Sequence, residues 1–252
     1  MEIALQRIHK CSNGILNLSN LKLTTLPPLP EGIVELNCSF NQLTSLPPLP
    51  STLDRLICSS NRLTSLPELP SLHVLYCNTN QLTSLPPLPS SLRDLRCFTN
   101  RLTSLPQLPS MMQFLNCCRN PLTTLPTLPL ELQALSCISS TLAFLPSLPA
   151  NLQILNCLGN PLETLPELPA TLQELRCELP MYDGAISFIG LDGRTVEHTN
   201  DMIRKATIGW NRLSRDRCMK RCAIYKEEIM MKVWHPSRVE RLLEMGYEME
   251  DM

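Results

Sequence analysis

The sequence predicts an α/β-type solenoid in which one short strand from each repeat joins a parallel sheet. Three observations support this prediction. The residue pattern repeats every 20 positions from about Ile15 to Cys177, a cysteine recurs at one position of the repeat, and each repeat contains a Leu-Pro-x-Leu-Pro motif. A unit this short cannot bury its own apolar face, so the repeats must stack on one another.

The first half of each repeat has the pattern of a short strand. Counting from the leucine that opens a repeat, as Leu53 does, the recurring apolar residues fall at positions one, four and six. A period of two therefore places Leu56 and Cys58 on one face of the strand, and Arg55 and Ile57 on the other. Successive strands of this kind are expected to pair in parallel, about 4.8 Å apart.

An asparagine occupies position nine of most repeats, where the strand turns away. Its amide can both donate and accept, so it can satisfy backbone groups that the turn leaves open. We therefore expect a structural column of asparagines that is interrupted by Ser140. The members of the column are Asn41, Asn61, Asn80, Asn100, Asn120 and Asn160.

The second half of each repeat is rich in proline. Proline lacks the amide proton and fixes φ, so the Leu-Pro-x-Leu-Pro motif cannot form an ordinary helix. The residue before each proline is also biased toward extended conformations. We expect this half to form an extended, polyproline-like convex side whose leucines point inward.

Eight of the 12 cysteines recur at position six of the repeat. They share the phase of the inward leucines, so we expect them to be small apolar core residues. Neighbours in a parallel column point the same way, which disfavours disulfides, and a linear column cannot give tetrahedral zinc coordination. Reduced thiols indicate a reducing compartment, so we expect a cytoplasmic location. The column consists of Cys38, Cys58, Cys77, Cys97, Cys117, Cys137, Cys157 and Cys177.

This combination of period, asparagine column and Leu-Pro-x-Leu-Pro motif resembles the 20-residue leucine-rich repeats of bacterial type III effectors. That group includes Yersinia outer protein M and the Shigella invasion plasmid antigen H proteins. The resemblance extends from about Ile15 to Pro180. It implies a leucine-rich repeat fold with the parallel sheet on the concave side and the variable strand residues facing a partner.

Composition excludes several classes of function. The formal net charge is −1, and neither half is basic enough to follow a phosphate backbone, so we expect no nucleic-acid partner. No apolar run reaches the roughly 18 residues of a membrane span. The first residues lack the continuous apolar region of a secretory signal. We expect no catalytic residue, no cofactor and no resident metal.

We divide the chain into an N-terminal cap at 1–14, a solenoid of about eight or nine repeats at 15–180, and a helical C-terminal domain at 181–252. A loop is expected from Asp183 to Gly193, followed by apolar residues at helical spacing. Terminal repeats need caps, so the simplest role for this last domain is a helical C-terminal cap.

Other interpretations of the C-terminal domain stay open. Cys218 and Cys222 lie one helical turn apart and could hold a metal with His198 or His235, although unpaired core thiols are commoner. The Cys-x-Asp motif of the Shigella-type ubiquitin ligase domain is absent from the sequence. The tail 235–244 resembles the C-terminal tails of repeat proteins from large DNA viruses, and this resemblance implies a viral protein.

The outward residues of the later repeats form the candidate partner site. Position seven is apolar in four successive repeats, and we expect these side chains to form one exposed column with large apolar residues beside it at position three. Arginines supply a polar rim. Alternatively, the C-terminal domain folds back over the column. The candidate partner-binding residues are Tyr76, Arg96, Phe98, Phe114, Cys118, Arg119, Ile138, Ile154 and Leu158.

We interpret the chain as a non-catalytic protein-protein interaction module, from a pathogen or a virus, that engages a host protein in the host cytoplasm. Two alternatives use the same features. One is a structural or assembly component, for example of a virus particle. The other is an adaptor that acts through the C-terminal helical segment.

Overall fold

The structure, a computed structural model, describes residues 2–11, 13–181 and 184–189. The chain divides into two compact units, Met1–Ile203 and Arg204–Met252, and every described residue belongs to the first. The helices expected in the C-terminal domain, together with Cys218 and Cys222, lie outside the described residues.

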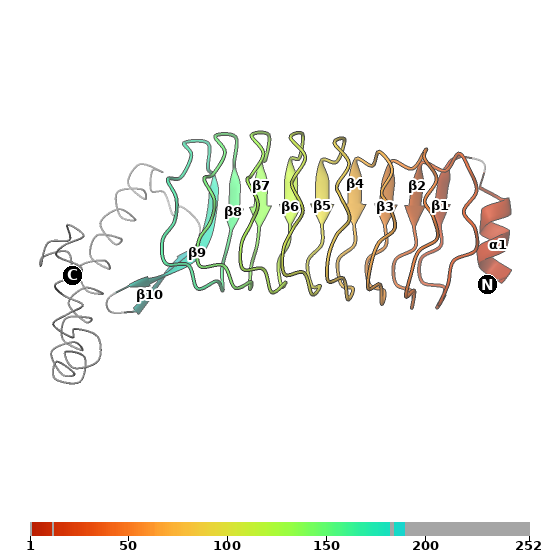
Figure 1. Ribbon diagram of the computed structural model, residues 1–252, viewed down its shortest axis with the longest axis horizontal. Helices are drawn as coiled ribbons and strands as arrows, with labels where there is room; N and C mark the ends of the chain where they lie inside the picture. The colour runs from red at the N-terminus through yellow and green to blue at the C-terminus, as the bar shows by residue number, and fades with distance from the viewer. Residues whose placement is uncertain (1, 12, 182–183, 190–252) are drawn as a thin grey trace, which may run out of the picture. The chain divides into compact units, whose positions relative to one another are not determined.

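The described strands form one sheet, and a helix precedes it. The strands pair in chain order from β1 to β10 (Figure 1). Pairs from β1 to β9 are parallel, and equivalent residues of successive repeats face each other, as Leu36 faces Leu56. The predicted parallel solenoid is therefore confirmed. The elements are α1 Glu2–His9, β1 Ile15–Asn17, β2 Glu35–Asn37, β3 Arg55–Ile57, β4 Val74–Tyr76, β5 Asp94–Arg96, β6 Phe114–Asn116, β7 Ala134–Ser136, β8 Ile154–Asn156, β9 Glu174–Met181 and β10 Gly184–Ile189.

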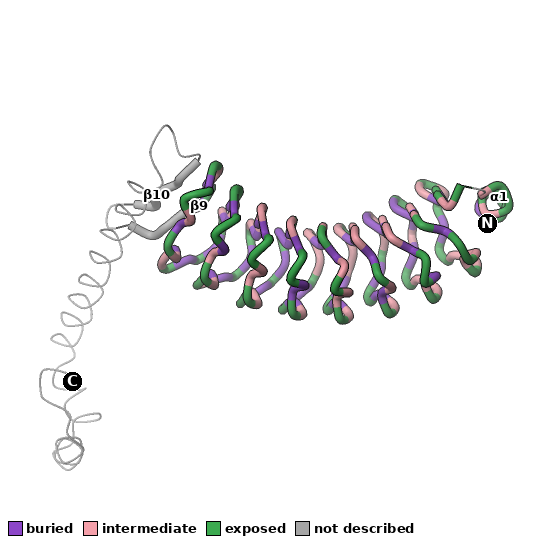
Figure 2. Tube along the Cα trace, turned by 90° about the horizontal axis from the view of Figure 1, so that it is seen from above, coloured by how far each residue is buried: buried purple, intermediate pink, exposed green. Residues whose placement is uncertain are grey.

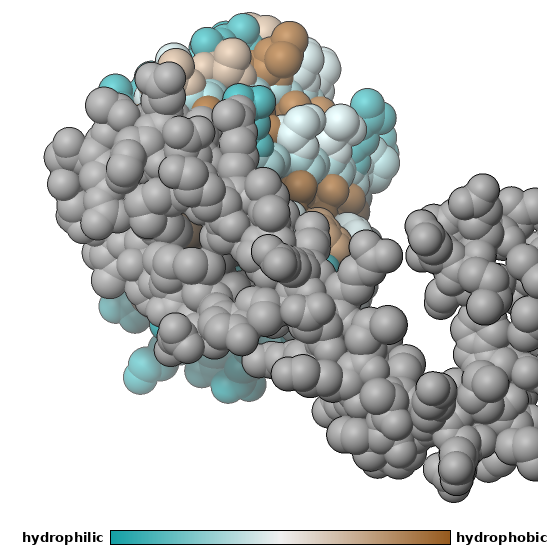
Figure 3. All heavy atoms as spheres, turned by 90° about the vertical axis from the view of Figure 1, so that its left-hand side faces the viewer, coloured by the Kyte–Doolittle hydropathy of each residue, from teal (hydrophilic) through white to brown (hydrophobic). Residues whose placement is uncertain are grey.

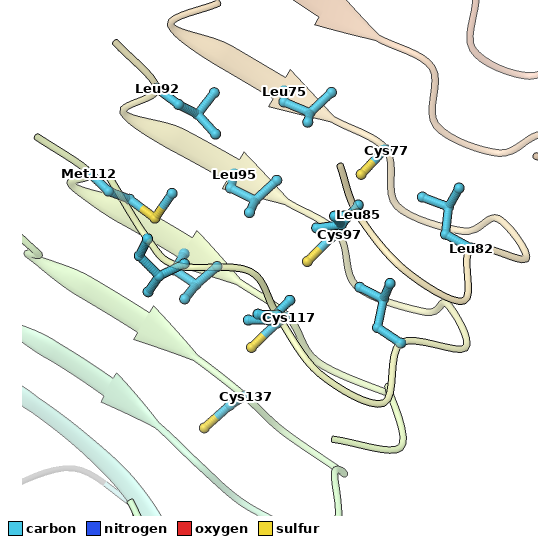
Figure 4. Packing of buried hydrophobic residues seen from close by; sticks show 14 of the residues in the cluster. Leu75, Cys77, Leu82, Leu85, Leu92, Leu95, Cys97, Met112, Cys117 and Cys137 are labelled. Carbon is cyan, nitrogen blue, oxygen red and sulfur yellow. The ribbon is translucent and has the colours of Figure 1, made fainter. Parts of the chain in front are cut away.

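Leucine at position four and cysteine at position six form the centre of the core. All eight column cysteines are fully buried, and none forms a disulfide. In Figure 4 the side chains of Cys77, Cys97, Cys117 and Cys137 follow one another through successive repeats, beside leucines such as Leu95. The prediction that the cysteines face inward is confirmed. Full burial of each leucine stabilises the fold by roughly 1.5–3 kcal/mol.

The segments that return from one strand to the next contain only bends, turns and irregular backbone between residues 18 and 173. Their leucines lie against the core, and Leu66, Leu69, Leu105 and Leu108 are buried. Figure 2 shows the repeat array from above as a shallow arc in which buried and exposed residues alternate along every turn. Proline thus prevents helix formation while the leucines still supply the packing.

Each column asparagine joins two repeats, as the sequence predicts. Asn61 Nδ2 donates to the carbonyl oxygen of Cys38 in the preceding repeat (3.0 Å) and of Cys58 in its own (3.1 Å). Its Oδ1 accepts from Leu43 N (3.0 Å). Ser140 takes the same position in the seventh repeat, where its buried Oγ has no hydrogen-bond partner among the described residues.

A left-handed residue lies at position eight, three residues after the end of each strand from β1 to β8. Asn20 takes this conformation in the first repeat (φ 56°), and φ lies between 51° and 57° at position eight of the six repeats that follow. The turn limits β2 to β8 to three residues each, so positions seven and eight lie outside the strands. The residues are Phe40, Ser60, Thr79, Thr99, Arg119 and Ser139.

Both ends of the sheet are extended by further elements. In α1, Ala4 is buried and Arg7 Nη1 donates to the carbonyl oxygen of Asn17 (2.8 Å), the last residue of β1. At the other end, β10 pairs with β9 in antiparallel fashion. The loop expected from Asp183 to Gly193 is therefore wrong over residues 184–189. The edge of β9 favours pairing, and the isoleucine and phenylalanine residues of this stretch favour a strand.

Candidate protein-binding surface

The outward side of the sheet changes character along the chain. We call the residues at positions three, five and seven of the second to eighth repeats the sheet surface. Viewed from the β9 end of the array, the coloured residues include apolar (brown) and polar (teal) groups side by side (Figure 3). On the sheet surface the charged residues lie on β2, β3 and β5, whereas β6 to β8 carry none.

The part of the sheet surface on β2 to β5 carries paired charges. Arg55 Nε lies 3.7 Å from Glu35 Oε2, and Arg96 Nη2 lies 3.3 Å from Asp94 Oδ2. The Tyr76 hydroxyl donates to Asp94 (2.7 Å), and the Arg96 guanidinium lies 4.3 Å from the centroid of the Tyr76 ring. Partial burial and the hydrogen bond to Asp94 raise the pKa of Tyr76. The charges of this part of the surface are thus largely satisfied internally.

The part of the sheet surface on the sixth to eighth repeats is uncharged, and we call it, together with Phe98 at its border, the neutral patch. Its most exposed apolar side chains are Phe114 (42%) and Ile154 (39%), with the small Ala134 between them in register. Position five supplies a row of short polar side chains between the two apolar rows. The neutral patch consists of Phe98, Phe114, Asn116, Cys118, Ala134, Ser136, Ile138, Ile154, Asn156 and Leu158.

Cys118 does not occupy the exposed position expected from the sequence. Its side chain is buried, with 8% exposure. Its Sγ lies 3.1 Å from Ser136 Oγ and accepts a hydrogen bond from Ile138 N (3.2 Å). These contacts turn the thiol toward the next repeat. The exposed apolar column that the sequence predicts at position seven is therefore interrupted at Cys118. Phe98, Ile138 and Leu158 are half-buried members of it.

The structure brings together some of the predicted residues and separates others. Phe114 and Ile154 lie in one row of the neutral patch, whereas Tyr76 and Arg96 belong to the charged part of the sheet surface. Arg119 is exposed in the left-handed turn after β6, at the border of the patch. Whether these residues bind a partner stays a prediction.

The buried thiols are poor candidates for nucleophilic chemistry. Burial raises the pKa of Cys38 and of Cys137 to about 12. It also raises the pKa of Cys58, Cys77 and Cys97, in each case with a further contribution from a neighbouring thiol. The thiolate is the reactive form of cysteine. These five thiols are therefore neutral and act as packing.

The sequence interpretation missed a groove on the opposite side of the array, where the return segments of the fourth to sixth repeats meet. It has a volume of about 1080 Å³ and is lined mainly by leucine and proline, for example Leu88 and Pro109. Leu130 and Met111 at its rim are 74% and 46% exposed. The sequence did contain a signal for this groove: Leu130 and Met111 are large and apolar, whereas other repeats carry small or polar residues at these two positions.

Within residues 2–11, 13–181 and 184–189, no group of three or more histidine, cysteine or acidic residues is placed to hold a metal ion. Over the same residues, no helix has the length and apolar character that would let it cross a membrane.

The protein family described as Leucine Rich repeats (2 copies) matches residues 51–90. No curated protein sequence matches the chain.

Two solved structures share both the fold and part of the sequence. The leucine-rich effector protein YopM from Yersinia pestis is 33% identical, with a TM-score of 0.66, over 71% of this chain and 60% of YopM. A Shigella effector LRR domain is 36% identical, with a TM-score of 0.59, over 64% of this chain and 77% of that domain. The chain therefore spans less than two thirds of the YopM structure but most of the Shigella domain.

Proposed function

Because the chain belongs to the leucine-rich repeat proteins of the class formed by the Yersinia and Shigella effector repeats, we propose that it is a non-catalytic module that binds another protein. Leucine-rich repeat folds are typical of protein-protein interaction. The binding surface in this proposal is the neutral patch. The rigid strands beneath it hold the side chains in fixed positions, which lowers the entropy lost on binding.

The proposal rests on one observation. Two large apolar side chains, Phe114 and Ile154, are exposed on a part of the sheet surface that has no charged residue. Neither side chain is needed in the core, where leucine and cysteine already fill positions four and six. A large apolar anchor contributes roughly 1.5–3 kcal/mol when it is fully buried, and a few such anchors dominate most interfaces. Arg96, Arg119 and Arg176 would then contribute a polar rim around the anchors.

The partner in this proposal is a host protein met in the cytoplasm. The similarity to effector repeat domains supports an effector-like role. The eight buried, unpaired cysteines support a reducing compartment, because free thiols persist there.

The test compares matched variants in a quantitative capture experiment with tagged full-length protein. Phe114→Asp combined with Ile154→Asp should abolish the specific capture of a partner while circular dichroism and thermal unfolding stay native. Val34→Asp is the control, because Val34 is 48% exposed but lies in the second repeat, away from the neutral patch. An equal loss of partner capture in the Val34→Asp control, or full capture by the double variant, would show that the binding site lies outside the neutral patch.

A further inference from the structure

We infer that the neutral patch takes an uncharged, proline-rich segment in the polyproline II conformation, laid across β6, β7 and β8. This inference rests on the proposed function, because it names the kind of partner segment that the same surface binds. Three features carry it: the hydrogen-bond donors at position five, their spacing, and the apolar rows on either side.

The row at position five offers amide donors whose oxygens are directed elsewhere. Asn116 Oδ1 accepts from Cys118 N (3.3 Å), and its Nδ2 makes no hydrogen bond within the part of the chain that the structure describes. Asn156 Oδ1 is buried and has no hydrogen-bond partner among the described residues, so we assign Nδ2 as the atom of this half-buried residue that donates to a ligand. Between them, Ser136 Oγ is occupied by the Cys118 thiol. A ligand that uses both donors must therefore place one hydrogen-bond acceptor over β6 and one over β8.

The spacing of these two donors selects the conformation of the ligand. Asn116 and Asn156 lie two strands apart in register, which corresponds to about 9.6 Å across a sheet. A polyproline II helix repeats every three residues with a rise of about 3.1 Å per residue, or about 9.3 Å per turn. Its carbonyl groups make no internal hydrogen bonds, so one in every three can accept from the row.

Other backbone conformations fit this row less well. An extended β-strand presents carbonyls on one side about every 6.6 Å, which does not match the two donors. An α-helix has its carbonyls occupied by its own amide groups, except at the C-terminal end. A polyproline II segment is also largely ordered before it binds, which reduces the entropic cost of docking.

The apolar rows and the absence of charge select the composition of the ligand. Ala134 lies between Phe114 and Ile154, so the row has a large-small-large profile that can seat one proline or leucine side chain. The nearest strand charges, on β5 and β9, are paired within their own strands: Asp94 with Arg96, and Glu174 with Arg176 (2.7 Å). The patch residues themselves carry no charge, so a charged ligand group buried over them would be disfavoured. The exposed Arg119 lies at the border of the patch and could meet only a charge at the edge of the ligand.

The experiment measures binding of a blocked, fluorescent peptide of repeating Leu-Pro-Pro units to the full chain by fluorescence anisotropy. We expect saturable binding that weakens about ten-fold in Asn116→Asp. The carboxylate still accepts from Cys118 N but cannot donate. Asn37→Asp is the matched control, because Asn37 occupies the same position outside the patch and its Oδ1 accepts from Ser39 in a similar way. Ile154→Ser tests the apolar row independently and should also weaken binding.

Several results would overturn the inference. They are an absence of saturable binding, equal binding of a Leu-Gly-Gly peptide with the same leucine spacing, or equal affinities of the Asn116→Asp and Asn37→Asp variants. Self-association that is lost in the Phe114→Asp, Ile154→Asp variant would identify a second copy as the occupant and would overturn it as well. If a protein partner still requires Phe114 and Ile154 while the peptide does not bind, the proposed function stands and only this inference fails. If neither binds through the patch, both fail.

Discussion

Asn160 Nδ2 donates a hydrogen bond of 2.8 Å to the carbonyl oxygen of Cys137, one repeat earlier. The equivalent bond is missing one repeat before, because Ser140 stands at the asparagine position and its buried hydroxyl has no partner among the described residues. The column of asparagines is therefore weakest at the junction between the sixth and seventh repeats, beneath the neutral patch.

Replacing Ser140 with asparagine should stabilise the protein. Ser140→Asn restores an acceptor for Leu122 N and a donor for the carbonyl oxygen of Cys117, and each net hydrogen bond contributes about 1 kcal/mol. Thermal unfolding should show a higher midpoint. The reverse change, Asn120→Ser, removes bonds to Cys97 and Leu102 and should lower the midpoint. A lower midpoint in both variants would show that the seventh repeat does not accommodate the amide.

Stability should fall at alkaline pH because of the cysteine column. The pKa of Cys38 and of Cys137 is about 12 in the folded state, compared with about 8.5 in an unfolded chain. The folded state therefore holds more protons between these values, and the free energy of unfolding decreases there by about 1.4 kcal/mol per pH unit for each such thiol. Denaturant unfolding between pH 8 and pH 11 should show a shallower slope in Cys38→Ala than in the parent chain. Identical pH slopes in the Cys38→Ala variant and the parent chain would contradict the raised pKa of Cys38 in the folded state.

Thiol labelling should separate the cysteines by burial. Cys11 is half-buried and should react with iodoacetamide in the native protein, whereas the eight column residues and Cys118 should react only after unfolding. Peptide mapping by mass spectrometry after a short exposure checks the order. Early modification of Cys97 would show that the core opens locally under native conditions.

The antiparallel strand β10 should stabilise the end of the solenoid. Its six residues pair with β9 and cover an edge that would otherwise leave backbone groups open. A chain that ends at Met181 should therefore unfold at a lower temperature or aggregate. An unchanged unfolding midpoint and solubility would mean that the repeats need no cover at this edge.

Much of the fold follows from the 20-residue period, because stacking leaves one arrangement for the leucines and cysteines. Only part of the candidate binding site could be predicted from the sequence. The rule that side chains alternate holds within a strand, and it places Phe114 and Ile154 correctly on the outward side. Cys118 lies beyond the end of β6, in the turn, where the rule no longer fixes the direction of the side chain.

Features that depend on contacts between repeats could not be read from a single repeat. The pairing of Tyr76 with Asp94 and Arg96 joins residues of neighbouring strands and converts a predicted binding residue into part of an ion-paired cluster. The groove near Leu130 also arises only where three return segments meet. Its exposed apolar rim offers a useful comparison surface for locating a partner.

Photo-crosslinking tests the central claim most directly. A photoreactive amino acid replaces either Ile154 in the neutral patch or Leu130 on the opposite side, and both variants are irradiated with the same captured partner. Ile154 and Leu130 are both exposed, at 39% and 74%, so accessibility alone does not favour the patch. The proposed function predicts a covalent adduct from position 154 and none from position 130. An adduct from position 130 alone would contradict it and would assign binding to the return side of the repeats.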